Sequence, residues 1–211
     1  MKEQQAVLDF FAQTENLPLG LAVAEQMDKL REQLNSRFWQ ALQLRLGDLI
    51  DGHALPWQVA TTEDRNSAGN LIGLYCILRA EQEIYLHPMM EQQNLGGNWR
   101  IYFSLMWSAV PTTNQLALPA VTALKKSLLQ AGFKNNEEHF AWQWTMLHPR
   151  SKDFLLHYAQ QPEKLLDDIE FIFRTLLIEH RELIEQANAA LKSAPHSLAV
   201  SLNQLRDELI G

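Results

Sequence analysis

Residues 99–107 alternate between large apolar side chains and a more mixed set. Trp99, Ile101, Phe103, Leu105 and Trp107 occupy every second position, and Arg100, Tyr102, Ser104 and Met106 lie between them. A repeat of two residues is the pattern of a β-strand that buries one face more deeply than the other. This segment therefore predicts the central strand of a sheet, around which the rest of the chain is organised.

Two segments before it are expected to pair with one another. Residues 71–78 form an apolar and aromatic run, which is too short to span a membrane and is typical of a strand covered on both faces. Residues 84–86 follow the polar stretch 80–83, so a hairpin with a short loop is the simplest interpretation. The polar passage after Pro88 ends in two glycines at 96–97, which suit a tight turn before the next strand.

Two more segments complete the expected sheet. Residues 140–146 alternate again, with Phe140, Trp142 and Trp144 at every second position, and are expected to form the last strand. Residues 57–62 are the candidate edge strand. We therefore predict an antiparallel sheet of about four to five strands.

The N-terminal quarter has the periodicity of helices. A short helix is expected at residues 2–13, and Asn16, Pro18 and Gly20 are expected to break the pattern after it. Residues 21–50 then predict one long amphipathic helix.

Apolar side chains recur three or four positions apart along this long helix. They are Met27, Leu30, Leu34, Phe38, Leu42, Leu46 and Leu49. We expect this stripe to hold the helix against the sheet. On the polar side, Glu25 and Lys29 have the i,i+4 spacing of a weak ion pair.

A helix is expected at residues 119–130, and the last third of the chain is helical by its pattern. The expected helices there cover residues 154–160, 162–192 and 198–210. Gly132 suits a helix end, Pro162 suits a first turn, and Pro195 separates the last two helices. The fold class is therefore predicted as α+β, with a sheet packed against long amphipathic helices. We expect residues 1–192 to form one domain and residues 193–211 to add a short helix.

The chain of 211 residues carries a net charge of −7, with a pI near 5.5. Sequence-independent binding to phosphate backbones needs clustered Lys and Arg, so nucleic-acid binding is disfavoured, although a local basic groove stays open. No run is long enough to span a bilayer, and the N-terminus lacks the order of a signal peptide. A cytoplasmic protein without membrane contact is expected.

Cys76 is the single cysteine and lies inside an apolar run. An intramolecular disulfide and a thiolate metal cage within one chain are therefore excluded. A reactive thiol needs exposure and a cationic neighbour, so we expect a buried structural thiol.

Four histidines share the C-terminal half with several acids. They are His139, His148, His157 and His180, beside Glu137, Glu138, Asp153 and Glu179. Helical metal sites use tight spacing such as His-Glu-x-x-His, and that spacing does not occur here. We interpret the histidines as surface or capping groups, and a metal-dependent hydrolase as the alternative.

Charged residues are densest at positions 179–182, where a general acid or base is conceivable. A solvated helix face is the favoured interpretation. The same holds for Asp167, Asp168 and Glu170, because metal-dependent nucleases place such acids on strands beside a lysine.

Aromatic residues of the strands raise the question of base stacking. They are Trp99, Tyr102, Trp107, Trp142 and Trp144. Sheets that bind RNA stack bases on such rings, but few cations accompany them here, so core filling is the favoured interpretation. The glycines at 96–97 precede a strand rather than a helix, which disfavours a phosphate-binding loop.

The order of elements resembles the C-terminal region that accompanies some PD-(D/E)XK nucleases of restriction and phage-defence type. The similar features span residues 21–192. They are the helix through Phe38 and Trp39, the hairpin at 84–86, the strand at 101–105, the helix before Gly132, the Trp142-Gln143-Trp144 strand and the long closing helix. The catalytic Asp with Glu-x-Lys is missing, since the strands carry only Arg79, Glu83 and Arg100. The resemblance therefore implies an accessory module without nuclease activity.

These observations favour a non-catalytic module that binds a protein partner through a helix face or a sheet edge, in a bacterial defence or mobile-element setting. Its amphipathic helices would also suit homodimerisation. The alternative is a metal-dependent hydrolase or nuclease that uses histidines and acids of the C-terminal half. No residue is assigned as catalytic, cofactor-binding or metal-ligating, and no cofactor is expected.

Overall fold

The computed structural model describes residues 2–61, 72–78, 85–95, 98–108, 110–136 and 139–194. Its strands form one antiparallel sheet in the order β1-β2-β3-β4-β5, and the predicted α+β class is confirmed. The features predicted at residues 63–70, 71, 79–84, 96–97, 137–138 and 198–210 lie outside the described residues.

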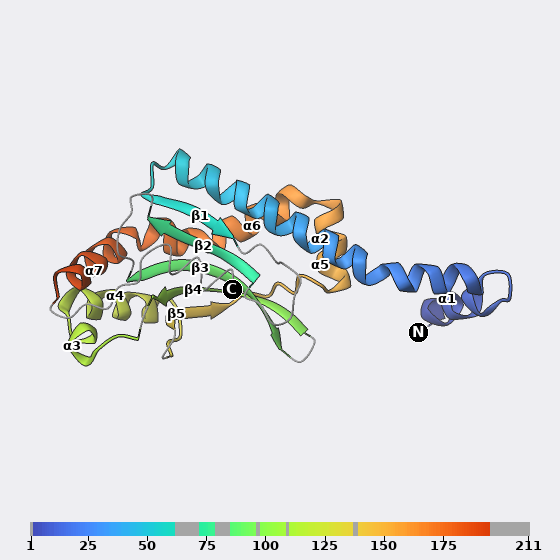
Figure 1. Cartoon of the computed structure of the whole chain (residues 1–211), viewed down its shortest axis with the longest axis horizontal. Helices are drawn as coiled ribbons and strands as arrows, with labels where there is room; N and C mark the ends of the chain where they lie inside the picture. The colour runs from blue at the N-terminus through green and yellow to red at the C-terminus, as the bar shows by residue number, and fades with distance from the viewer. Residues whose placement is uncertain are drawn as a thin grey trace.

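Helices precede, interrupt and follow the sheet (Figure 1). The strands are β1 (Trp57–Thr61), β2 (Ile72–Leu78), β3 (Leu86–Leu95), β4 (Asn98–Trp107) and β5 (His139–Trp144). The helices are α1 (Lys2–Ala12), α2 (Leu17–Gly52), α3 (Thr113–Leu116), α4 (Pro119–Gln130), α5 (Lys152–Gln160), α6 (Pro162–Arg174), the π-helical turn η1 (Thr175–Glu179) and α7 (Arg181–Ser193).

The polar passage after Pro88 is part of strand β3 and not a loop. It pairs residue for residue with β4, from Leu86 opposite Trp107 to Leu95 opposite Asn98. The strand expected at residues 84–86 is therefore too short in the prediction, because polar side chains of the passage are buried and hydrogen-bonded within the longer strand. Gln92 accepts a hydrogen bond from the buried Trp39 indole of α2, at 3.0 Å between Nε1 and Oε1.

The two faces of the sheet differ in what covers them. The larger core combines alternate strand residues, such as Cys76, Met90 and Phe103, with side chains from α2, α4, α5, α6 and α7. The smaller core consists of Tyr75, Ile77, Met89 and Tyr102, and no helical residue of the described chain belongs to it. We call the first the helix face of the sheet and the second the open face.

The predicted single helix at 162–192 is interrupted by a π turn. Its i→i+5 hydrogen bond joins the His180 amide to the Thr175 carbonyl at 3.1 Å. The extra residue advances the apolar stripe by one position, so that both Leu176 and Leu177 are buried. The interruption keeps both halves of the stripe facing the core.

Helix α2 begins at Leu17, after Asn16, and runs through Pro18 and Gly20, which were expected to break the helical pattern. Pro18 lies in its first turn, where a proline costs no hydrogen bond. Gly20 contacts α1, since a Cβ there would lie 2.9 Å from Phe11 Cδ1. The break after residue 13 is therefore only a short turn between two helices.

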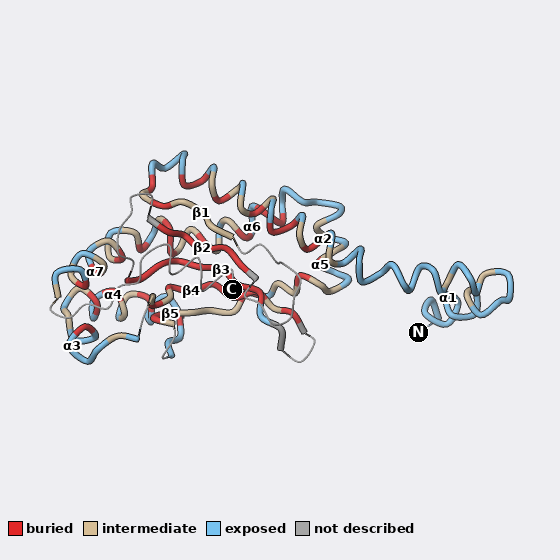
Figure 2. The backbone as a smooth tube through the Cα atoms, viewed as in Figure 1, coloured by how far each residue is buried: buried red, intermediate tan, exposed pale blue. Residues whose placement is uncertain are grey.

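Helix α1 and the first half of α2 project away from the rest of the molecule (Figure 1). We call residues 2–33 the N-terminal arm. None of its residues is buried, and Figure 2 shows α1 and the adjoining part of α2 almost entirely in the colour of exposed residues. The predicted stripe holds α2 to the body only from Phe38 onward, where Phe38, Leu42 and Leu46 are fully buried.

Candidate functional site

The four histidines of the C-terminal half lie apart in the structure. His139 is on β5, His148 is in the connection to α5, His157 is on α5, and His180 ends the π turn. Among the described residues, no group of three His, Cys, Asp or Glu side chains is placed to hold a metal ion. Glu137 and Glu138 lie outside them. The described part of the chain therefore offers no ligand set for the metal-dependent alternative.

Of the two roles expected for the histidines, surface group or capping group, His180 has the second, at the end of the π turn. Its side chain is buried, and its Nδ1 lies 2.9 Å from the Thr175 carbonyl oxygen. Because a carbonyl can only accept a hydrogen bond, Nδ1 carries the proton in this contact. The expectation that positions 179–182 form one solvated face is thus wrong for His180, while Glu179 and Glu182 are exposed.

The acids of α6 lie at the surface beside α2. Asp167 pairs with Arg45 at 3.2 Å, and Glu163 pairs with the same guanidinium. Asp168 is exposed, and Glu170 pairs with Arg174 one turn further on, at 3.5 Å. Glu163 and Asp167 thus join α6 to α2, and the acids of α6 do not belong to a cluster that could hold a metal ion among the described residues.

The aromatic residues of the strands divide between the two faces of the sheet. Trp99 and Trp107 fill the core of the helix face, as predicted. Tyr102, Trp142 and Trp144 lie on the open face, where both tryptophans are only half-buried. The prediction of core filling is therefore confirmed for Trp99 and Trp107, whereas Trp142 and Trp144 fill the core only in part.

Cys76 is fully buried in the core of the helix face. Burial raises the pKa of its thiol far above the ordinary value. The predicted structural thiol is confirmed, because an un-ionised buried thiol is a poor nucleophile.

His87 is a buried polar residue that the sequence analysis missed. It is fully buried on β3, and neither ring nitrogen has a hydrogen-bond partner among the described residues. Burial, together with the nearby His139, lowers the pKa of His87 to about 4. The sequence analysis ended the strand at residue 86, so it gave His87 no place in the sheet.

A second polar group of the open face is also buried. The Tyr75 hydroxyl has no hydrogen-bond partner among the described residues, and burial and the charge of Glu91 raise the pKa of Tyr75. His139 contacts the buried Ser104, with 3.2 Å between Nδ1 and Oγ. The open face is thus a mixed aromatic and polar surface.

The N-terminal arm carries the most extensive exposed apolar surface of the described chain. Nine of its large apolar side chains are between 36% and 64% exposed. They are Val7, Leu8, Phe10, Leu17, Leu19, Leu21, Val23, Met27 and Leu30. A groove of about 490 Å³ follows α2 along Val23, Met27 and Leu30, with Lys29 at its border.

None of the described helices is both long enough and apolar enough to cross a membrane. No family model, curated protein or solved structure matches the chain.

Proposed function

We propose that this chain is a non-catalytic interaction module that associates with a second copy of itself through the N-terminal arm. The observation that carries the proposal is the single apolar stripe of α2. Its C-terminal half fills the core, and its N-terminal half has the same residue types and spacing, but its apolar side chains are exposed.

The exposed half of this stripe has the spacing that packs against another helix. Val23, Met27 and Leu30 continue the register of Phe38 and Leu42 beyond the body of the protein. Apolar helix faces bind one another through positions three and four apart, and burial yields roughly 25 cal/mol per Å² of apolar surface. The stripe therefore favours a helical partner over an extended peptide.

The exposed apolar side chains of the arm favour an interface. Leu19, Val23, Met27 and Leu30 are spaced three or four residues apart, so they share one side of α2, and each is at least 36% exposed. Clustered exposed apolar side chains of this kind mark interaction surfaces, to which each partner of a standard interface contributes about 800 Å².

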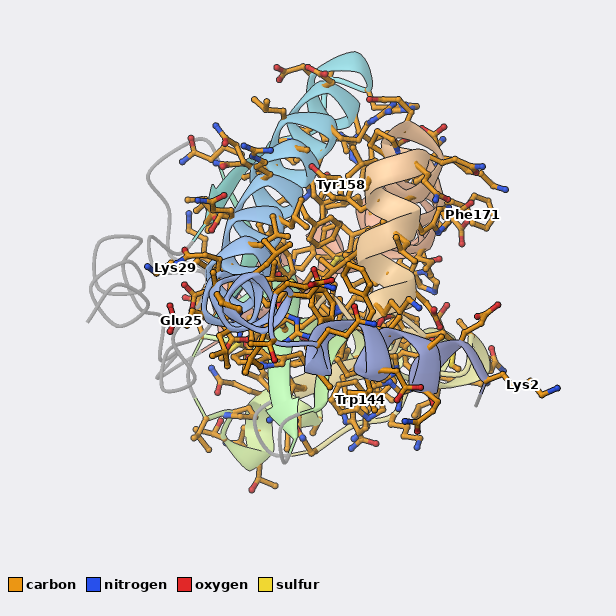
Figure 3. All side chains as sticks on the ribbon, turned by 90° about the vertical axis from the view of Figure 1, so that its right-hand side faces the viewer. Lys2, Glu25, Lys29, Trp144, Tyr158 and Phe171 are labelled. Atoms are coloured by element: carbon orange, nitrogen blue, oxygen red, sulfur yellow. The ribbon has the colours of Figure 1, made fainter. Side chains whose placement is uncertain are left out.

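The charges beside the groove favour a second copy as the partner. Glu25 and Lys29 form no ion pair with any described residue, and the ion pair in this region is Asp28–Arg31 at 3.1 Å. The predicted i,i+4 pair is therefore absent. Figure 3 shows Glu25 and Lys29 side by side on the side of α2 away from α1.

An antiparallel copy of the arm satisfies both charges at once. When the two-fold axis passes near Met27, Glu25 of one copy lies opposite the partner's Lys29, and the reverse pair forms by symmetry. The resemblance to an accessory region supports a non-catalytic role and adds nothing to the choice of partner.

Sedimentation of the full chain over a range of concentrations tests the proposal. We expect the wild type to be dimeric at micromolar concentration. Leu30→Glu should weaken the dimer more than about tenfold, because it places a charge inside the interface. Leu44→Glu is the matched control, since Leu44 is 66% exposed on the same helix but outside the arm.

Two results contradict this function. One is a wild type that stays monomeric across the whole range. The other is a Leu44→Glu variant that dissociates as readily as Leu30→Glu, which would place the interface elsewhere on α2.

Charge exchange tests the antiparallel register in the same assay. Glu25→Lys and Lys29→Glu should each weaken the dimer, since each sets like charges opposite one another twice. An equimolar mixture of the two variants should recover association as a heterodimer. If the mixture associates no better than either variant alone, the register is wrong even when the arm is the interface.

A further inference from the structure

The open face of the sheet holds a pocket that is separate from the arm. Its volume is about 420 Å³, within the range of small-molecule sites. Glu91 of β3, Tyr102 and Met106 of β4, and His139, Trp142 and Trp144 of β5 line it, together with neighbouring polar groups. The pocket thus draws side chains from three adjacent strands.

Strand register brings these side chains together. Glu91 lies opposite Tyr102, which lies opposite Trp144, so the three form one row across the sheet. Gly73 precedes Glu91 in that row on β2 and adds no side chain. Even a Cβ at this position would lie 2.3 Å from the Met90 carbonyl oxygen, so the close approach of the two strands requires glycine.

The rings in the pocket stand nearly perpendicular to one another. Tyr102 and Trp144 have centroids 5.4 Å apart at 72°, and Trp142 and Trp144 have centroids 5.8 Å apart at 84°. His139 meets Tyr102 at 82°. Perpendicular rings present faces on more than one side, and the face of an aromatic ring is its electron-rich surface.

The faces of these indoles already attract cations of the chain. The Arg100 guanidinium carbon lies 5.0 Å from the Trp144 centroid, and the Lys134 ammonium lies 5.4 Å from the Trp142 centroid. Neither cation lines the pocket, and Arg100 is held by a 2.9 Å hydrogen bond from Nε to the Thr145 carbonyl. The carboxylate that lines the pocket is Glu91, which is almost completely buried.

We propose that this pocket binds a small organic cation of the alkylated-ammonium class. Electron-rich ring faces and a carboxylate both attract a positive charge, and ring faces tolerate the methyl groups that a bare ammonium lacks. The net charge of −7 favours the approach of a cation to the protein. The buried Trp142 indole N–H has no acceptor among the described residues, so a hydroxyl beside the cation suits the site.

Choline is the probe that tests this site, and its neutral tert-butyl analogue is the matched ligand. The analogue keeps the shape and the hydroxyl but replaces the charged nitrogen by carbon. Calorimetric titration of the full chain should give at least about tenfold tighter binding of choline than of the analogue. Choline should also raise the melting temperature of the protein.

Two conservative variants check the residues. Glu91→Gln removes the charge at constant shape, and Trp144→Phe keeps a ring with a less electron-rich face. Each should weaken choline binding about tenfold without affecting dimerisation. Glu182→Gln, a change at an exposed carboxylate of α7, should leave choline binding unchanged.

Three outcomes overturn the proposal. Equal affinity for choline and its neutral analogue would mean that the pocket is merely apolar. If adenosine monophosphate binds and choline does not, the open face is a base-stacking surface instead. Failure of both cation and nucleotide to bind at millimolar concentration would mean that the pocket is not a site for either class.

Discussion

His87 is the residue whose burial is hardest to reconcile with its chemistry. Its side chain is fully buried, and burying two ring nitrogens without hydrogen bonds is unfavourable for folding. No hydrogen bond to a described residue offsets this cost. Its register partner is Met106, and His139 lies one strand further along the same row, so the imidazole adjoins the pocket of the open face. Neutral histidine fits there only because burial opposes its protonation.

Acidification should destabilise the protein through His87. Its pKa of about 4 in the folded chain lies below the unfolded value near 6.5, so the unfolded state binds a proton first as the pH falls. The stability contributed by this group is complete above pH 6.5 and is lost as the pH falls toward 4. Denaturant unfolding at pH 7 and pH 4.5 should differ by about 2–3 kcal/mol from this residue alone.

His87→Leu identifies that contribution. The variant should lose this part of the pH dependence and be as stable as the wild type or more stable at pH 7, since it removes unsatisfied nitrogens. His53→Leu, at an exposed position, is the control and should keep the wild-type slope. An unchanged slope in His87→Leu would assign the acid sensitivity to other groups.

At the level of elements, two glycines have opposite roles. Gly73 of β2 allows the backbone of β3 to approach, whereas Gly47 in α2 has no heavy atom within 4 Å of an added Cβ. Gly73→Ala should lower the free energy of unfolding by about 1–3 kcal/mol or more, because the backbone carbonyl of Met90 cannot move aside cheaply.

Gly47→Ala should change stability in the other direction. Alanine is favoured over glycine in a helix interior by about 1 kcal/mol, and the space at Gly47 is open. Chemical denaturation of both variants and the wild type measures the pair. Equal effects of the two substitutions would contradict the strand contact inferred for Gly73.

The whole molecule has a body with two cores and an arm without one. If two folded chains associate through their arms, the stability of the fold depends on the protein concentration. A tenfold increase in protein concentration should therefore raise the melting temperature by about 1–2 °C. The melting temperature of Leu30→Glu should depend less on concentration, because its dimer is weaker, and calorimetry over a dilution series can check this.

The sequence by itself determined the spacing of the apolar side chains in each segment, and with it the type of secondary structure. Alternation at 99–107 and the stripe of α2 correctly predicted a strand and a helix, because side-chain spacing reports local geometry. It could not show where polar residues are buried, so the strand expected at residues 84–86 was too short, and β3 in fact continues to Leu95. The π turn at Thr175–Glu179 was also missed.

Only the tertiary structure decided which faces are covered. Phe38 and Leu30 belong to one stripe, yet one is buried in the core and the other is exposed on the arm, because the body ends between them. Trp107 and Trp142 both belong to alternating strands, yet they face opposite sides of the sheet. Burial depends on contacts between distant segments, and neither candidate surface could be located until the chain had folded.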